Sequence, residues 1–379
     1  MSKPKIIFIS DANHVAAQIP GGVQVCTAEY LRLLDHCGFE VVNFLTRPSR
    51  SLLYRVKARL GIEVLERYDC VADFPRLRGL VKESGANLVA INQVALLGFA
   101  GLLKQALGGK IKILLLSHGN ESGDFLHEVV RRRYATGVLR LRDICRLGMT
   151  IYREAVAFKD CFDVVLALSE TDAHTIRWMG AARTVFIPRL LERREIGWSP
   201  ILRRVGFIGT LNHRPNLDGL TALLEQLSWK KRPPTVRVVG GPVECGRALQ
   251  AQFNFVEYVG QLSDDELERE AATWAVFVNP IFWYARGAST KLAIGIGWGL
   301  PIISTSPGNR GYRWQRGNLM TTESPCQMAD AVDLVCGDSQ RLAEMAHETR
   351  LISDSGPRLE ELAGDVLQAI ATLENDRAS

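Results

Sequence analysis

The sequence has 379 residues, of which 47% are hydrophobic and 23% charged, and its formal net charge is +5. At about 150 residues per domain this length predicts two domains. The composition is that of an ordinary globular protein and excludes a disordered chain, a fibrous repeat and a small disulfide scaffold. Residues 1–185 hold 25 Lys and Arg against 18 Asp and Glu, which gives that half +7 and the remainder −2.

The apolar segments of the chain are short. Ile6–Ile9 is too short for the apolar core of a signal peptide and indicates a buried strand. Leu88–Leu103 is interrupted by Asn92 and Gln93, and falls short of the ~18 apolar residues that a membrane span needs. Eight cysteines are scattered without a Cys-x-x-Cys pair, which favours small thiols in a reducing compartment. These features predict a cytoplasmic protein.

In the first half, short apolar runs alternate with segments of helical periodicity. The predicted strands are Lys5–Ser10, Glu40–Leu45, Asn87–Asn92, Ile111–Ser117, Asp163–Ser169 and Thr184–Pro188. The predicted helices between them are Gln24–Cys37, Phe74–Glu83, Leu97–Ala106, Val129–Lys159 and Glu170–Met179. Strands separated by helices predict a parallel sheet covered on both faces.

The same alternation starts again after Leu191–Ile201, a polar, irregular segment that we interpret as a linker. The predicted strands of this second series are Val205–Ile208, Thr235–Val239, Phe253–Tyr258, Val276–Asn279 and Pro301–Ser304. Its predicted helices are Leu217–Leu227, Asp264–Thr273, Lys291–Trp298, Pro325–Val335, Ser339–Ile352 and Arg358–Glu374. We therefore expect α/β domains at 1–190 and 201–355, and at 356–379 a C-terminal helix that can pack back on the first domain.

Three loops that follow predicted strands have the residues to bind phosphate. The first contains Gly21-Gly22, the second runs from 206 to 216, and the third from 285 to 291 opens a helix with Ser289, Thr290 and Lys291. Backbone N–H groups at a helix start attract anions. Simpler interpretations are a tight turn for the glycines, a helix cap for Asn212 or Asn216, and a solvated surface residue for Lys291. The loops match neither a Walker A motif nor a dinucleotide-binding Gly-x-Gly-x-x-Gly.

Six short blocks of the second half follow one another in a specific order. They are Val205–Gly209, Pro215–Gly219, Val256–Gly260, Val278–Pro280, Arg286–Lys291 and Gly299–Thr305. In this order they resemble the nucleotide-sugar-binding domain of retaining glycosyltransferases with the GT-B fold, in the family 4 group. Weaker matches in the first half are Gly21-Gly22, Ser117–Gly119 and Leu168–Glu170. The resemblance implies two Rossmann-like, doubly wound domains facing each other across a cleft, an acceptor in the first and the sugar donor in the second.

The resemblance also implies roles for single residues. The nucleotide-diphosphate sugar would be a co-substrate, with no further cofactor and no metal ion, and the sequence indeed has no Asp-x-Asp motif. The catalytic residues would be His118 beside the transferred sugar, and Lys291 and Arg286 near the leaving diphosphate. The donor would be bound by Gly21, Gly22, Gly209, Thr210, Arg214, Ser289, Thr290 and Arg310. On the acceptor side we expect Asn120 and Glu121. Alternatively, His118 is a buried imidazole with its hydrogen bonds satisfied inside the protein, and Glu121 is a carboxylate that is only solvated.

The third loop departs from the family pattern. Many members carry two glutamates at the positions of Arg286 and Ile294. The alternatives to a transferase acting in cell-surface polysaccharide assembly are therefore a GT-B-like epimerase and a non-catalytic sugar- or nucleotide-binding relative.

The segment 127–159 is basic and amphipathic, with eight Lys and Arg against three Asp and Glu. Basic amphipathic helices can lie on anionic membranes, which would place the protein at the inner face of the membrane. The alternative is a core helix with a solvated basic face. A second basic segment is 47–67. No aromatic stacking platform accompanies the charges of either segment, so we expect no nucleic acid partner.

Overall fold

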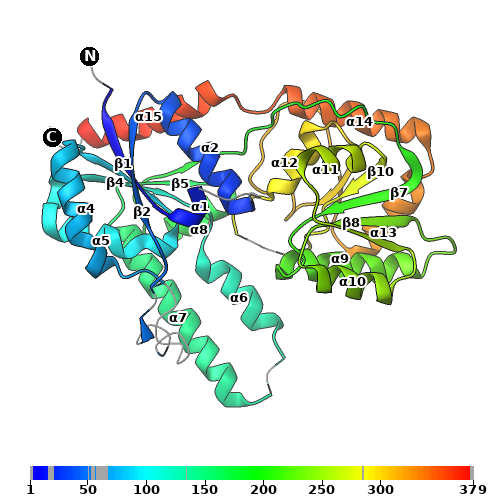
Figure 1. Cartoon of the computed structure of the whole chain (residues 1–379), viewed down its shortest axis with the longest axis horizontal. Helices are drawn as coiled ribbons and strands as arrows, with labels where there is room; N and C mark the ends of the chain where they lie inside the picture. Colours follow the sequence, from blue (N-terminus) through cyan, green and yellow to red (C-terminus); the bar gives the residue numbers. More distant parts are fainter. Residues whose placement is uncertain are drawn as a thin grey trace. The chain divides into compact units, whose positions relative to one another are not determined.

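The computed structural model describes residues 3–15, 21–49, 51, 52, 56, 67–133, 135–283 and 286–375. Most of the basic segment 47–67 lies outside these residues. So do Pro20, which precedes Gly21-Gly22 in the first predicted phosphate loop, and Ala285 of the third. The chain divides into two compact units (Figure 1). Unit 1 comprises Met1–Pro188 together with Arg358–Ser379, and unit 2 comprises Arg189–Pro357.

Unit 1 contains a six-stranded parallel sheet in the order β2-β1-β3-β4-β5-β6. Its strands are β1 (Lys5–Asp11), β2 (Glu40–Thr46), β3 (Leu88–Asn92), β4 (Lys112–Leu116), β5 (Val164–Ala167) and β6 (Thr184–Phe186). Its helices are α1 (Ala12–Val15), α2 (Gly22–His36), α4 (Cys70–Ser84), α5 (Leu97–Leu107), α6 (Glu121–Arg131), α7 (Gly137–Asp160), α8 (Glu170–Trp178) and α15 (Leu359–Asn375). Strands β3 and β5 are buried along their whole length, as expected for a parallel sheet covered on both faces. The C-terminal helix α15 packs against α2.

Unit 2 contains a second six-stranded parallel sheet, in the order β12-β11-β10-β7-β8-β9. Its strands are β7 (Ile201–Ile208), β8 (Thr235–Val239), β9 (Val256–Gly260), β10 (Trp274–Val278), β11 (Ile302–Thr305) and β12 (Met320–Thr322). Its helices are α9 (Arg214–Ser228), α10 (Val243–Gln252), α11 (Asp264–Ala271), α12 (Thr290–Gly297), α13 (Pro325–Val335) and α14 (Ser339–Asp354). The two parallel sheets confirm the predicted α/β class of two Rossmann-like domains.

The structure differs from the sequence-based elements at several places. The predicted helix Val129–Lys159 is two helices, because the chain leaves α6 after Arg131 and Thr136 caps the start of α7. Helix α10 and strand β12 were not predicted; α10 buries only Gly246 and Leu249, so its apolar periodicity is weak. The predicted linker Leu191–Ile201 has no helix or strand before β7 starts at Ile201, but Leu191 and Trp198 pack into the apolar core of unit 2. None of the described helices is long and apolar enough to span a membrane.

Candidate functional site

The carboxyl ends of β7, β10 and β11 lie at one edge of the sheet of unit 2, because all three strands are parallel. Two helices begin at this edge, α9 after β7 and α12 after β10. A Cβ atom at Gly219 in α9 would lie only 1.8 Å from the carbonyl oxygen of Pro280, which follows β10. Glycine is therefore required where α9 approaches the loop that leads to α12.

Lys291 is buried in the first turn of α12 and is the centre of this site. Its ammonium group donates a hydrogen bond to Oδ1 of Asn216 and lies 5.0 Å from the ring centroid of Phe207. No carboxylate contacts Lys291 within the described residues. Burial, together with repulsion from Arg310, lowers the pKa of Lys291 from 10.5 to about 7. A solvated surface lysine, the simpler interpretation of the sequence, is therefore excluded.

The backbone that leads into α12 is fixed by side chains from the loops that follow β10 and β11. Ser289 is the N-cap residue, and its hydroxyl donates to Oδ1 of the buried Asn279 at 3.3 Å. The hydroxyl of Tyr312 donates to the carbonyl oxygen of Ser289. The first turn of α12, which starts at Thr290, has no acidic residue and no side-chain cap. The N–H groups of Leu292 and Ala293 donate to the carbonyl oxygen of Ser289 and to the hydroxyl of Tyr312, both at 3.0 Å. Those of Thr290 and Lys291 keep the positive end of the helix available to an anion.

Arg310 is the second cation at this edge, since its charge is one of the two causes that lower the pKa of Lys291. Its guanidinium donates to the carbonyl oxygen of Pro307 and, at 3.2 Å, to that of Arg286. Arg310 thus links the loop after β11 to the loop before α12. Arg286 contributes its carbonyl oxygen to this link, and its side chain is partly buried.

Gly209 and Thr210 follow β7, as predicted, and Asn216 connects them to Lys291. The Nδ2 atom of Asn216 donates to the carbonyl oxygen of Thr210 at 3.0 Å, while its Oδ1 accepts from Lys291. The predicted capping role of Asn212 or Asn216 is wrong, because His213 is the N-cap of α9. Arg214 is exposed at the first position of α9, and the structure gives it no contact with the other predicted residues.

In unit 1, His118 is buried just beyond β4 and is held by Asn92 at the end of β3. The Nε2 atom of His118 lies 2.7 Å from Oδ1 of Asn92. The Nδ2 atom of Asn92 donates to the hydroxyls of Ser10 and Thr27, both at 3.0 Å. Tyr30 packs edge-on against the imidazole, with ring centroids 5.6 Å apart. Sequence reasoning missed Asn92 as a site residue, although an asparagine that ends a buried strand is a signal for it.

The acceptor-side candidates lie on the loop that starts α6. Asn120 is fully buried and donates to the sulfur of Met179 at 3.5 Å. Glu121 begins α6, and its backbone N–H donates to Oε1 of Glu154 on α7 at 2.8 Å. Ser122 donates to the same carboxylate through its N–H, at 3.3 Å, and through its hydroxyl. Glu154, which the sequence did not single out, therefore fixes this loop to α7.

The predicted glycine loop lies at the start of α2. Gly21 is the N-cap residue in an extended conformation, Gly22 is the first helical residue, and both are exposed. The first turn of α2 has no acidic residue and no side-chain cap.

At the end of β1, the buried carboxylate of Asp11 accepts a hydrogen bond of 2.7 Å from the hydroxyl of Tyr68, a pair that the sequence did not indicate.

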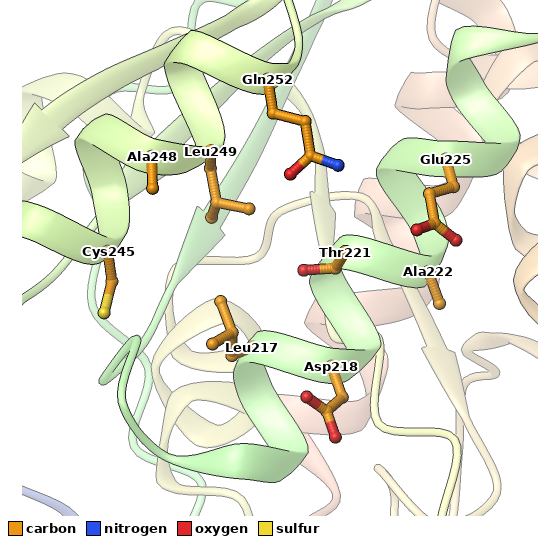
Figure 2. Close-up of a pocket in the computed structure, with 9 residues that line it drawn as sticks. All are labelled: Leu217, Asp218, Thr221, Ala222, Glu225, Cys245, Ala248, Leu249 and Gln252. Atoms are coloured by element: carbon orange, nitrogen blue, oxygen red, sulfur yellow. The ribbon is translucent and has the colours of Figure 1, made fainter.

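A groove of about 460 Å³ lies elsewhere in unit 2, between α9 and α10. Its walls are shown in Figure 2 and consist of Leu217, Asp218, Thr221, Ala222, Glu225, Cys245, Ala248, Leu249 and Gln252. None of the predicted site residues is among them. Among the described residues, no group of three or more His, Cys, Asp or Glu side chains could hold a metal ion.

Comparison with known proteins gives solved structures of the same fold. No family model matches the sequence, and no curated protein matches it. The sucrose-phosphate synthase of Thermosynechococcus elongatus is 17% identical, with a TM-score of 0.69 over 99% of this chain and 100% of that one. HepE of Anabaena, solved with UDP and glucose, is 13% identical, with a TM-score of 0.64 over 97% of this chain and 100% of that one.

A pneumococcal O-GlcNAc transferase, GtfA, solved with UDP and GlcNAc, is 15% identical, with a TM-score of 0.51 over 78% of this chain and 59% of that one. The similar structures are GT-B glycosyltransferases, and the fold of the chain is GT-B, as the resemblance of the sequence blocks implied.

Proposed function

We propose that the protein is a glycosyltransferase that moves a sugar from a nucleoside diphosphate to a glycan or lipid-linked acceptor. The observation that carries the proposal is the buried Lys291, which has no carboxylate partner among the described residues and lies in the first turn of a helix. A buried ammonium without an anion is costly, and its lowered pKa of about 7 reflects that cost. A bound diphosphate supplies the missing negative charge.

The chemistry of sugar transfer needs such a site. When the bond between the sugar and the diphosphate breaks, negative charge grows on the leaving phosphate oxygens. Lys291, Arg310 and the N–H groups at the start of α12 are held in place before the reaction, so they stabilise this charge without reorganisation. UDP is present in the solved structures of HepE and GtfA, and for this chain we propose the same class of donor.

In this proposal, residues of unit 1 contact the transferred sugar and the acceptor. His118, oriented by Asn92, contacts the transferred sugar, and Asn120 and Glu121 contact the acceptor. We propose that the transfer takes place in the cytoplasm and is a step in the assembly of a cell-surface polysaccharide. The resemblance of the sequence blocks supports this role. All eight cysteines are free thiols, which agrees with a reducing compartment.

Thermal unfolding with UDP, GDP and ADP tests the donor site. A nucleotide at 100 times its Kd raises the free energy of unfolding by about 2.7 kcal/mol, so one of the three stabilises the protein measurably. Lys291→Ala weakens its affinity by about 10- to 150-fold, the loss of one hydrogen bond to a charged group. The control is Lys231→Ala, which removes an exposed lysine of unit 2 and leaves the affinity unchanged. If none of the nucleotides stabilises the protein, the donor site is wrong.

Retention of configuration and independence of metal ions are part of the proposal and need separate tests. Proton NMR of the product reports its anomeric configuration, and an inverted product would exclude the retaining mechanism. Because Lys291 and Arg310 supply positive charge themselves, a chelator such as EDTA leaves the nucleotide affinity unchanged. A tenfold loss with EDTA, reversed by added Mg²⁺, contradicts this. Nucleotide binding without transfer to any acceptor favours the non-catalytic relative.

A further inference from the structure

One face of α7 exposes a line of apolar side chains along the whole helix. Its residues recur every three or four positions and are Val138, Leu141, Cys145, Met149, Tyr152 and Val156, here called the α7 stripe. The exposed fractions of the five larger ones run from 40% at Val156 to 77% at Val138. The helices of a globular protein normally bury such a stripe against the core.

The opposite face of α7 is the one that packs against the protein, and it is unusually polar. Its buried residues include Asp143, Thr150 and Glu154. Glu154 holds the start of α6, and Figure 1 shows α6 and α7 extending side by side beyond the sheet of unit 1. Only the C-terminal part of α7, with Ala157 and Phe158, enters the apolar core. Helix α7 therefore packs through its polar face, and the α7 stripe takes no part in this packing.

The charges beside the α7 stripe are almost all positive. Arg142, Arg146 and Arg153 follow one side of it at helical spacing. The acidic residues of this region do not neutralise all of these arginines. Asp143 is shared by Arg132 at 2.6 Å and Arg142 at 3.0 Å, and Glu154 is buried and accepts from the start of α6. Arg153 forms no ion pair within the described part of the chain. The surface therefore combines exposed apolar side chains with a surplus of unneutralised arginine.

We propose that the α7 stripe docks on an anionic lipid surface. An amphipathic helix lies in the plane of a membrane, with its apolar face among the acyl chains and its basic residues at the headgroups. Arginines next to the stripe are placed to meet lipid phosphates. Pairing the stripe with a second copy of the chain would instead bring arginines together without carboxylates between them. This inference goes beyond sugar transfer and does not depend on the donor site.

Flotation of the full chain with vesicles tests the proposal. One set of vesicles is pure phosphatidylcholine and the other contains phosphatidylglycerol. The unmodified protein floats with the anionic vesicles and is released by high salt, which screens surface charge. The double variant Leu141→Ser, Tyr152→Ser no longer floats. In Arg153→Gln, partitioning onto anionic vesicles falls by about fivefold.

Two control variants carry the same chemical changes on α4, another surface of unit 1. Val71→Ser removes a side chain that is 73% exposed, and Arg78→Gln removes an exposed arginine. Both float like the unmodified protein. Equal flotation on neutral and anionic vesicles, or flotation of the stripe variant, overturns the proposal. A dimer in solution that dissociates when Leu141 and Tyr152 are changed also overturns it, because a second copy then covers the stripe. The stripe variant should bind nucleotide as the unmodified protein does. A loss of flotation then reports on the α7 stripe and not on the donor site.

Discussion

The ammonium group of Lys291 donates to Oδ1 of Asn216, and Nδ2 of the same amide donates to the carbonyl oxygen of Thr210 at 3.0 Å. The bond to Thr210 orients the amide, so that its oxygen faces the buried cation. Within the described residues, this oxygen and the face of Phe207 are what Lys291 contacts. Asn216 is therefore the group that keeps the cation in place when no ligand is bound.

Asn216→Ala should lower the free energy of unfolding by about 1–3 kcal/mol, because it leaves the buried ammonium without an acceptor. Denaturant unfolding measures this loss, and added nucleotide should recover part of it by supplying an anion. Asn212→Ala is the matched control, since this exposed asparagine of the same loop has no side-chain hydrogen bond in the described residues. Equal effects of the two variants would show that Asn216 does not hold Lys291.

The lowered pKa of Lys291 predicts a dependence of stability on pH. Between its folded pKa of about 7 and its ordinary value of 10.5, the unfolded chain binds the proton and the folded chain does not. Stability should therefore rise with pH across this window, by at most about 1.4 kcal/mol per pH unit. Lys291→Met lacks this contribution, so the difference between the two proteins isolates it from the contributions of all other groups.

Nucleotide affinity should change in the opposite direction over the same window. A bound diphosphate favours the charged ammonium, so binding takes up a proton and weakens above about pH 7, by up to about tenfold per pH unit. Calorimetry in two buffers of different ionisation enthalpy measures the proton uptake. Affinity that is constant from pH 7 to 10, with no proton uptake, would mean that Lys291 does not contact the anion.

The sequence was sufficient to predict the start of α12 and all the strands of the two sheets except β12. Buried parallel strands are runs of apolar residues, and a helix that opens with Ser289, Thr290 and Lys291 is visible without tertiary information. What could not be predicted are contacts between residues far apart in the chain. Asn216 meets Lys291 across 75 positions, and Asn92 meets His118 across 26. Such pairs depend on which strands are neighbours in the sheet.

The region of α7 shows a second limit of the sequence. Asp143 and Glu154 belong to a residue type that is almost never fully buried unless paired, so the pattern favoured a basic outer face and an apolar inner one. The structure leaves the basic residues on the outside but exposes the α7 stripe as well and buries the two carboxylates. This is possible because Arg132 and Arg142 neutralise Asp143 and the start of α6 satisfies Glu154. Partners in another helix decide which face of α7 is buried, and periodicity alone does not contain them.

Asn92→Ala should release His118 from its fixed orientation. In the folded protein the amide nitrogen of Asn92 is used by Ser10 and Thr27, so its oxygen faces the imidazole and favours a proton on Nε2. Nitrogen NMR of the imidazole should show this tautomer in the unmodified protein and a mixture in the variant. Ser10→Ala, which keeps the bond between Asn92 and His118, should preserve the tautomer. Transfer should slow in Asn92→Ala while the nucleotide affinity stays constant.

Glu154→Gln should remove a loss of stability that the unmodified protein shows between about pH 4.5 and 7. Burial raises the pKa of Glu154 from 4.5 to about 7, against the hydrogen bonds from Ser122 and Glu121. In this window the folded state holds a proton that the unfolded state has released, so stability falls as the pH rises. Glutamine still accepts from the two backbone N–H groups but does not titrate, so the variant should show a flatter profile.

The control for Glu154→Gln is Glu128→Gln, which changes an exposed carboxylate of α6 and should leave the slope between pH 4.5 and 7 intact. Hydrogen exchange at the amides of Glu121 and Ser122 gives a local measurement of the same effect, because both donate to Glu154. Their protection should decrease in Glu154→Ala and persist in Glu154→Gln. If both variants lost protection equally, the negative charge of Glu154, and not its capacity to accept hydrogen bonds, would hold the start of α6.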